Sequence, residues 1–219
     1  MFSVIFEVQP RKERFDAYLA LAGRLRPILE TIEGFIDNER FESLRRPGWL
    51  LSHSSWRDEK SVVRWRTVGE HHAVQQQGRG GIFADYHLRV GEVTADSAPP
   101  AGLPLREQRF DETEVGVAKV ASLTEIMPEP GEAAAAAPEA VMARLGVPAG
   151  ALVEHDLFRS ITTAGKLALL LSWRDREAAQ RWRPEGARLR HRRIRIIRDY
   201  GMFDRREAPQ YYPEVRREA

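Results

Sequence analysis

The pattern of apolar and polar positions divides the N-terminal half of the chain into four strands and two helices. Short stretches rich in Val, Ile, Leu, Phe and Trp predict strands at residues 2–8, 35–44, 49–56 and 82–93. After the first strand, apolar side chains recur at steps of three and four residues, which is typical of an amphipathic helix, and Gly34 ends it. Asp58 is a favourable N-cap for a second helix that runs to about Gln77. The predicted order is therefore β-α-β-β-α-β.

The chain repeats itself after 117 residues, the spacing between Trp56 and Trp173. With this shift Ser55-Trp56-Arg57-Asp58 aligns with Ser172-Trp173-Arg174-Asp175, and Arg64-Trp65-Arg66 aligns with Arg181-Trp182-Arg183. Tryptophan is rare, so matched pairs of tryptophans indicate a duplicated unit. We predict a first repeat at residues 1–93, a linker at 94–113, and a second repeat with a C-terminal tail at 114–219.

The predicted element order indicates an α+β fold. Two helices inserted this way among four strands cover one face of an antiparallel sheet, the ferredoxin-like arrangement, and leave the other face bare. We expect the two βαββαβ repeats to bury these bare faces against each other, sheet to sheet, as a barrel within one chain. The linker contains Ala98-Pro99-Pro100-Ala101-Gly102 and few large apolar residues, so we expect it to be exposed.

Composition narrows the class of protein. The chain has 219 residues and no cysteine, which excludes disulfides, thiolate metal sites and cysteine nucleophiles and fits a reducing compartment. Its 34 Lys and Arg residues nearly balance 32 Asp and Glu residues. No apolar run approaches the length of about 18 residues that a membrane-spanning helix needs. These features predict a cytoplasmic protein without a membrane association.

Two polar motifs carry little functional signal. The basic run Arg188–Arg195 lacks interleaved aromatic residues and alternates as a strand does near Ile194, so we interpret most of its arginines as a solvated face and consider nucleic acid an unlikely partner. Gly78-Arg79-Gly80-Gly81 has the composition of a phosphate-binding loop, but no Lys-Ser/Thr pair follows it. It is interpreted as a flexible connection or a lid.

The second predicted helix carries the most informative polar residue. If the helix is continuous, Trp65 and His72 differ by only about 20° around its axis, whereas His71 points elsewhere. The repeat has Leu189 at the position of His72. A histidine there must either form a hydrogen bond inside the core or line a cavity, because an unpaired buried polar group costs roughly 1–3 kcal/mol. Both alternatives stay open.

No set of histidines has a spacing that indicates a metal site. His71 and His72 diverge by about 100° on a helix and cannot bind one ion together. His53 and His87 lie on predicted strands and meet His72 only if the fold brings them there. We therefore expect no metal.

Several motifs together resemble the antibiotic biosynthesis monooxygenase (ABM) domain family. They are Gly34-Phe35, Ser55-Trp56-Arg57-Asp58, Trp65, Glu70-His71-His72, Gln76, Gly78 and the strand from Tyr86 to Val93. The resemblance covers nearly all of the first repeat and, more faintly, the second. It implies a dimeric α+β barrel, here formed by a tandem duplication.

The resemblance also implies an activity. Members of the family oxygenate aromatic polyketides without a cofactor, or open haem oxidatively. The haem-degrading branch uses an Asn, a Trp and a His. Trp65 and His72 match the last two, but the asparagine belongs on the first strand, where Ser3–Val8 has none, and Asn38 is the only asparagine in the chain.

The expected function is a cofactor-independent monooxygenase that acts on a small aromatic or polyketide-type molecule. His72 would deprotonate the substrate, and the carbanion would reduce dioxygen. The expected catalytic residues are His72, Trp65 and Asn38, and the expected substrate-binding residues are Tyr86, Trp56 and His53. A non-catalytic duplicated binding module and a haem-binding or haem-degrading protein are the alternatives. Whether the chain forms a homo-oligomer stays open.

Overall fold

The computed structural model describes residues 1–129, 137–148 and 150–215. The alanine run at 133–137, whose conformation the sequence left open, lies outside the described residues except for Ala137. In the described part of the chain, no helix combines the length and the apolar character needed to cross a bilayer.

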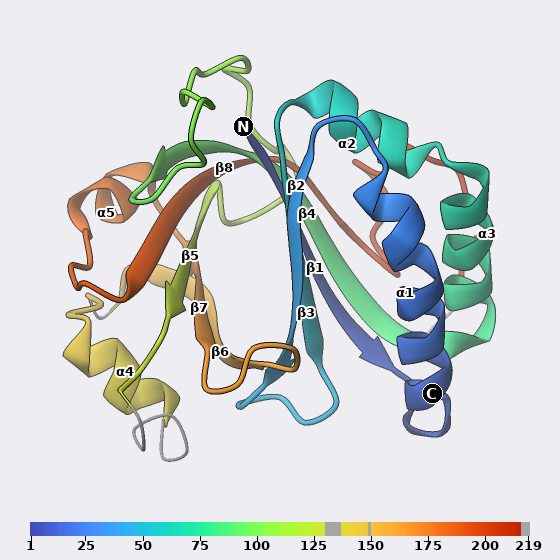
Figure 1. The fold of residues 1–219 in the computed structure, drawn as a ribbon, viewed down its shortest axis with the longest axis horizontal. Coiled ribbons are helices and arrows are strands. Elements are labelled where there is room, and N and C mark those ends of the chain that lie inside the picture. The colour runs from blue at the N-terminus through green and yellow to red at the C-terminus, as the bar shows by residue number, and fades with distance from the viewer. Residues whose placement is uncertain (130–136, 149, 216–219) are drawn as a thin grey trace.

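Eight antiparallel strands close into one barrel (Figure 1). They are β1 Phe2–Pro10, β2 Phe35–Ser43, β3 Leu50–Trp56, β4 Phe83–Asp96, β5 Val120–Ile126, β6 Leu152–Ser160, β7 Leu167–Trp173 and β8 Leu189–Gly201. Around the barrel the order is β1-β3-β2-β6-β7-β5-β8-β4. The first half thus contributes β4-β1-β3-β2, and the second contributes β8-β5-β7-β6 in the corresponding order.

The two halves are joined at their strand edges. β2 pairs with β6, and β4 pairs with β8, both through antiparallel backbone hydrogen bonds. The α+β class is confirmed, but the expected sheet-to-sheet packing differs from what is observed. The edges pair because each half would otherwise leave two strands with unpaired N–H and C=O groups, which a closed barrel removes.

The helices divide unequally between the halves. The first half carries η1 Lys12–Arg14, α1 Phe15–Glu30, α2 Glu59–Arg66, α3 Gly69–Gln77 and the turn η2 Gly78–Ile82. In the described part of the second half, the helices are the short α4 Pro138–Arg144 and α5 Arg176–Arg181. Figure 1 shows α1, α2 and α3 together on one side of the barrel, over the outer face of the first-half sheet.

The expected single helix from Asp58 to Gln77 is broken in two. Its N-cap is confirmed, because the Asp58 side chain accepts a hydrogen bond from the Ser61 backbone N–H at 2.8 Å. However, Val68 adopts an extended conformation (φ −61°, ψ 130°) between α2 and α3. The β-branched Thr67 and Val68 followed by a glycine form a run of poor helix formers. Angles projected around one continuous helix therefore fail beyond Arg66.

Two arginines of the basic run are buried rather than solvated. Arg192 is 1% exposed and pairs with Glu125 at 2.5 Å, and Arg195 is 6% exposed and pairs with Glu92 at 2.8 Å. Both arginines lie on β8, which has strands on either side that supply acidic partners. The expectation of a solvated face is wrong for these two because it treated β8 as an exposed strand.

Most of the linker after β4 is exposed, but it is anchored to the barrel at several points. The backbone N–H groups of Gln108 and Arg109 donate to the buried Glu92 carboxylate at 2.6 and 3.1 Å. Leu105 packs against the apolar cluster inside the barrel, and Thr113 is buried. The Pro- and Gly-rich composition concealed this because the anchoring groups are mainly backbone donors, which composition does not reveal.

Acidification from pH 6.5 to pH 4 should lower the stability of the barrel. Burial and the charge of Arg192 lower the pKa of His53 to about 4 from its ordinary 6.5, so the folded state keeps this ring neutral while the unfolded chain protonates it. The unfolded state then binds more protons, and the free energy of unfolding falls by up to roughly 3 kcal/mol. Urea denaturation at pH 7 and near pH 4 measures this loss. His53→Gln should reduce the loss, and an unchanged loss in the variant would exclude His53 as its source.

Candidate functional site

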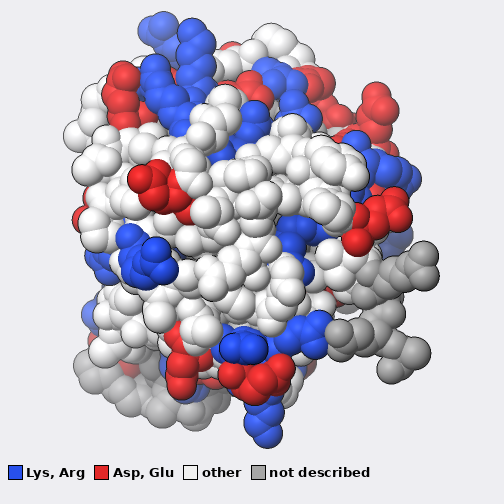
Figure 2. Space-filling view, turned by 90° about the vertical axis from the view of Figure 1, so that its right-hand side faces the viewer, with Lys and Arg blue, Asp and Glu red and all other residues white. Residues whose placement is uncertain are grey.

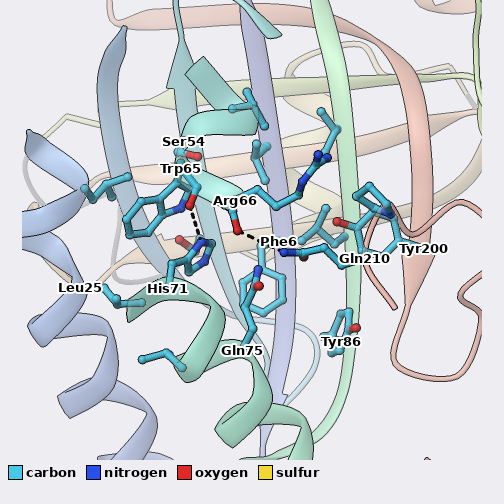
Figure 3. Close-up of a pocket in the computed structure, with 18 of the residues that line it drawn as sticks. Phe6, Leu25, Ser54, Trp65, Arg66, His71, Gln75, Tyr86, Tyr200 and Gln210 are labelled. Atoms are coloured by element: carbon cyan, nitrogen blue, oxygen red, sulfur yellow. Dashed lines mark hydrogen bonds between the residues drawn. The ribbon is translucent and has the colours of Figure 1, made fainter. Parts of the chain in front are cut away.

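A cavity of about 190 Å³ lies between the helices α1 to α3 and the outer face of the first-half sheet (Figure 3). Its walls are mainly apolar and aromatic, and they include Val4, Phe6, Leu21, Leu25, Leu29, Val62, Phe83, Leu88 and Val90. A few polar side chains enter it from the strands and from the helix junction. This combination of apolar walls with few polar groups is typical of a small-molecule site.

The cavity depends on small polar residues that the second half lacks. Ser52 and Ser54 on β3 line it, and the shift of 117 residues places Leu169 and Leu171 at the corresponding positions of β7. Both leucines are fully buried in the apolar cluster beneath α4 and α5. The leucines therefore fill the second half, whereas the smaller serines at the corresponding positions leave space in the first half.

His71 and Trp65 form a stacked pair at the junction of α2 and α3. The two rings are 4.1 Å apart at an interplanar angle of 15°, and both residues line the cavity. His71 Nδ1 lies 3.0 Å from the Trp65 carbonyl oxygen. Because a carbonyl oxygen only accepts, Nδ1 carries the proton and Nε2 keeps a lone pair. Burial lowers the pKa of His71 to about 4, so the ring is neutral at pH 7.

His72 is not among the residues that line the cavity. Its ring stacks on Tyr212 at 5.4 Å, and its Nδ1 lies 3.1 Å from the Tyr212 hydroxyl. The expected face shared by Trp65 and His72 does not form, because the helix break turns α3 relative to α2. The neighbouring histidine takes the place beside the tryptophan.

Asn38 and Tyr86 both line the cavity, but the Asn38 amide group is already hydrogen-bonded. Asn38 Nδ2 donates to Ser52 Oγ at 3.0 Å and to the His53 carbonyl at 2.9 Å. Both of its N–H groups are used, so Asn38 orients Ser52 rather than offering a donor to a ligand. Ser52 Oγ accepts this bond, which leaves its own proton to donate into the cavity.

Trp56 and His53 do not reach the cavity. Trp56 is fully buried beside Phe2 and Leu29 and donates its indole N–H to Ser54 Oγ at 2.9 Å. His53 points to the other face of β3, where its Nε2 lies 2.7 Å from Ser3 Oγ. Successive strand residues alternate between faces, so His53 cannot share the cavity with its neighbours on β3. Their expected role in substrate binding has no geometric support.

The C-terminal segment 204–215 crosses from the second half and covers the cavity. Gln210 Nε2 donates to the Arg66 carbonyl at 3.2 Å, and the Tyr212 hydroxyl donates to Gln75 Oε1 at 2.8 Å. Figure 3 shows Gln210 between Arg66 and Tyr200. This contact was not predicted from the sequence. The Tyr211-Tyr212 pair in an otherwise polar tail is the signal that could have indicated a docking contact.

Glu7, His87 and Glu154 have ligand atoms within 4.8 Å of one another. However, Arg89 pairs with both glutamates, and Arg46 also pairs with Glu7. A cation at this point would have to displace guanidinium groups. The arrangement among the described residues is that of a partly buried ion-pair network rather than a metal centre.

Comparison with known proteins places these features in context. Residues 1–77 match the family described as antibiotic biosynthesis monooxygenase. A protein of Pyricularia oryzae named jasmonate monooxygenase ABM is 44% identical over 222 residues, which cover 97% of this chain and 99% of that protein.

Two solved structures are more distant. An anthrone oxidase-like protein is 13% identical, with 95% of this chain and 96% of that chain covered and a TM-score of 0.39. Rv0793 of Mycobacterium tuberculosis is 18% identical, with 49% and 98% covered and the same TM-score. At such low scores neither structure bears on the site or on the substrate.

Proposed function

Because the chain belongs to the antibiotic biosynthesis monooxygenase family, we propose that it is a monooxygenase whose substrate binds in the cavity beside Trp65 and His71. The observation that carries the proposal is the neutral His71 imidazole with Nε2 unprotonated on the cavity wall. An unprotonated imidazole on the wall of a largely apolar cavity is available to accept a proton from a substrate bound there, and the C-terminal segment covers part of that cavity.

The proposed reaction draws its electrons from the substrate. His71 Nε2 removes a proton from a CH2 group that a carbonyl or a phenolic ring activates. The carbanion transfers electrons to dioxygen, forms a C–O bond and loses water, so that CH2 and O2 give C=O and H2O. The balance needs no external reductant and no cofactor.

Two side chains are placed to stabilise the negative charge that develops on the substrate oxygen. Ser52 and Ser54 both line the cavity, and each Oγ already accepts one hydrogen bond, from Asn38 and from Trp56. Their hydroxyl protons are therefore available as donors. Oriented donors at the site of developing charge are worth several kcal/mol in a dry cavity, on the order of 2.7–4 kcal/mol for one donor.

Two substrate classes are consistent with this chemistry. The relative in Pyricularia oryzae is named for jasmonate, and the carbons beside the ring ketone of a jasmonate are carbon acids. The aromatic or polyketide-type substrate expected from the sequence is favoured by the rings of Phe6, Trp65 and Tyr86 along the walls. We place the jasmonate class first because the identity to that relative extends over nearly the whole chain.

We also infer that residues 1–93 and 114–219 are duplicated ferredoxin-like repeats joined by residues 94–113. The corresponding strand orders of the two halves and the match after 117 residues support this inference. Only the first repeat would then hold a site.

Oxygen uptake by the purified chain with jasmonic acid and with anthrone, measured separately, tests the function. Uptake with either compound supports a monooxygenase. A ligand-induced change in fluorescence without uptake from either one would instead support the non-catalytic binding module and contradict the proposal. A spectral shift with haem alone would support the haem-binding alternative.

Ser52→Leu should abolish oxygen uptake while preserving the fold. The variant gives β3 the residue that β7 has at the corresponding position, and its side chain would occupy the cavity. Burying a leucine there is favourable by roughly 1.5–3 kcal/mol, so the melting temperature should be unchanged or higher. Uptake at the wild-type rate in this variant would show that the reaction takes place elsewhere.

A further inference from the structure

Five arginines line the cavity, namely Arg40 on β2 and four others from four further elements. Arg66 ends α2, Arg79 lies in η2, Arg198 lies on β8, and Arg205 belongs to the C-terminal segment. We refer to these four residues as the arginine cluster. The remaining walls are mostly apolar, so the positive charge stands out against its surroundings.

Neutral partners contact two members of the cluster, Arg79 and Arg205. The Tyr86 hydroxyl accepts hydrogen bonds from Arg79 at 2.8 Å and from Arg205 at 2.6 Å. The Arg205 guanidinium also lies 5.3 Å from the ring centres of both Tyr200 and Tyr212. Both arginines donate in addition to backbone carbonyl oxygens, at 2.8–3.2 Å. These contacts orient the two guanidinium groups, but none of the partners contributes a full negative charge to balance them.

Within the described residues, no carboxylate forms an ion pair with any member of the cluster. Glu59, which lines the cavity, pairs with Arg109 at 2.7 Å instead. The acids next to the cluster in the sequence are also engaged elsewhere: Asp199 with His87 at 2.6 Å, Asp204 with Arg206, and Glu207 with Thr113 at 2.7 Å. Arg79 is 6% exposed, and its Nε is buried without a hydrogen-bond partner, as is Nε of Arg66. Buried charges are usually paired, because an unpaired one is costly.

The cluster does not belong to a basic surface patch. On the face that covers the cavity, Figure 2 shows positive and negative side chains interspersed around uncharged residues, without a continuous positive area. Arg79 lies beneath this surface, and Arg66, Arg198 and Arg205 are only partly exposed. The positive charge therefore faces a ligand small enough to enter the cavity rather than a large polyanion on the surface.

We propose that the arginine cluster binds the carboxylate of a small ligand whose apolar body occupies the rest of the cavity. A planar guanidinium presents paired N–H donors that match the two oxygens of a carboxylate. The inference rests on the proposed function, since it assigns a chemical class to the substrate of that same cavity. It further implies that the C-terminal segment, which supplies Arg205, completes the binding site.

Isothermal titration with octanoate and with methyl octanoate tests the proposal, because the two probes share an apolar chain and differ in charge. Octanoate should bind at least about 10-fold more tightly, since a charge-assisted hydrogen bond is worth about 1.5–3 kcal/mol. The advantage should shrink as salt is added. Equal affinity for the acid and the ester would overturn the proposal.

Arg205→Met should weaken octanoate binding about 10-fold or more and leave methyl octanoate nearly unaffected. Arg206→Met is the matched control, because Arg206 is the next residue, is exposed and pairs with Asp204. Equal losses in the two variants would contradict the proposal. If Arg205→Met lowers the melting temperature, Arg66→Met repeats the test from another element of the cavity.

These titrations do not depend on turnover, so they are separate from the test of the monooxygenase. A chain that consumes oxygen but binds acid and ester equally would keep its proposed function and lose the carboxylate site. A chain that binds the acid more tightly but consumes no oxygen would keep the carboxylate site and lose its proposed function.

Discussion

His71→Gln should lower the turnover number for oxygen uptake about 100-fold or more, whereas His72→Gln should leave it nearly unchanged. The contribution of a positioned general base is about 10²–10⁴-fold. His71 meets the geometric requirement, because its Nδ1 proton is fixed by the Trp65 carbonyl and its Nε2 is free on the cavity wall. Glutamine has a similar length and keeps a hydrogen-bonding group, but it cannot take a proton.

The pH profile adds a readout that a merely structural role would not move. Burial lowers the pKa of His71 to about 4, so the base is unprotonated throughout the neutral range. The rate should therefore be flat above about pH 5 and fall as the pH drops through 4. A wild-type profile that falls near pH 6.5 would indicate an exposed histidine instead.

His72→Gln is the matched control for this experiment. It changes the adjacent residue and keeps a polar side chain opposite Tyr212. Loss of turnover in this variant with retention in His71→Gln would restore His72 as the base and refute the assignment.

Arg89→Met should destabilise the folded chain by about 3 kcal/mol. Arg89 is 1% exposed inside the barrel, where it pairs with Glu7 and donates to Ser172 Oγ at 2.6 Å. Methionine fills similar space but leaves the buried Glu7 with Arg46 as its one remaining ionic partner among the described residues. The midpoint of urea denaturation should fall without a large change in slope.

Two further variants separate charge from packing. Glu7→Leu combined with Arg89→Met removes both charges and should recover a large part of the lost stability, because a buried ion pair is often replaceable by apolar residues. Arg26→Met breaks the exposed pair with Glu30 and should cost less than about 1 kcal/mol. If the double variant is no more stable than Arg89→Met, the loss comes from packing and the ionic explanation is wrong.

The elements of the first half were predictable because their signals are local. The four strands lie within a few residues of their predicted bounds, and Asp58 caps the helix at which it was expected. The α+β class followed from the order of these elements. Each of these predictions needs only a short window of sequence.

The parts that were mispredicted depend on contacts between distant segments or on a single backbone angle. Because Val68 is extended, His71 rather than His72 lines the cavity. The two residues are both histidines, so residue type alone could not show which of them does. Arg192 was expected to be solvated because its partner Glu125 is remote in sequence. Burial of an ionic residue can be predicted only once the neighbouring strand is known.

The cavity itself was only partly predictable. Trp65, Asn38 and Tyr86 were expected at a site and do line it. The alignment of the two repeats places Ser52 opposite Leu169. A small polar residue at the position of a large apolar one indicates that one half has space where the other is filled. The contribution of Arg205 could not be foreseen, since it comes from a tail beyond the aligned region.

The pairing of β2 with β6 and of β4 with β8 leaves every strand of the described barrel with two hydrogen-bonded neighbours. The two seams differ in length, because β4 pairs with β8 from His87 to Asp96, whereas β2 pairs with β6 only from Phe41 to Ser43. Among the described residues, an added strand would therefore find unpaired backbone groups beside the short seam, along the rest of β2 and β6. Opening of the barrel should begin at this short seam, since it has fewer hydrogen bonds to break.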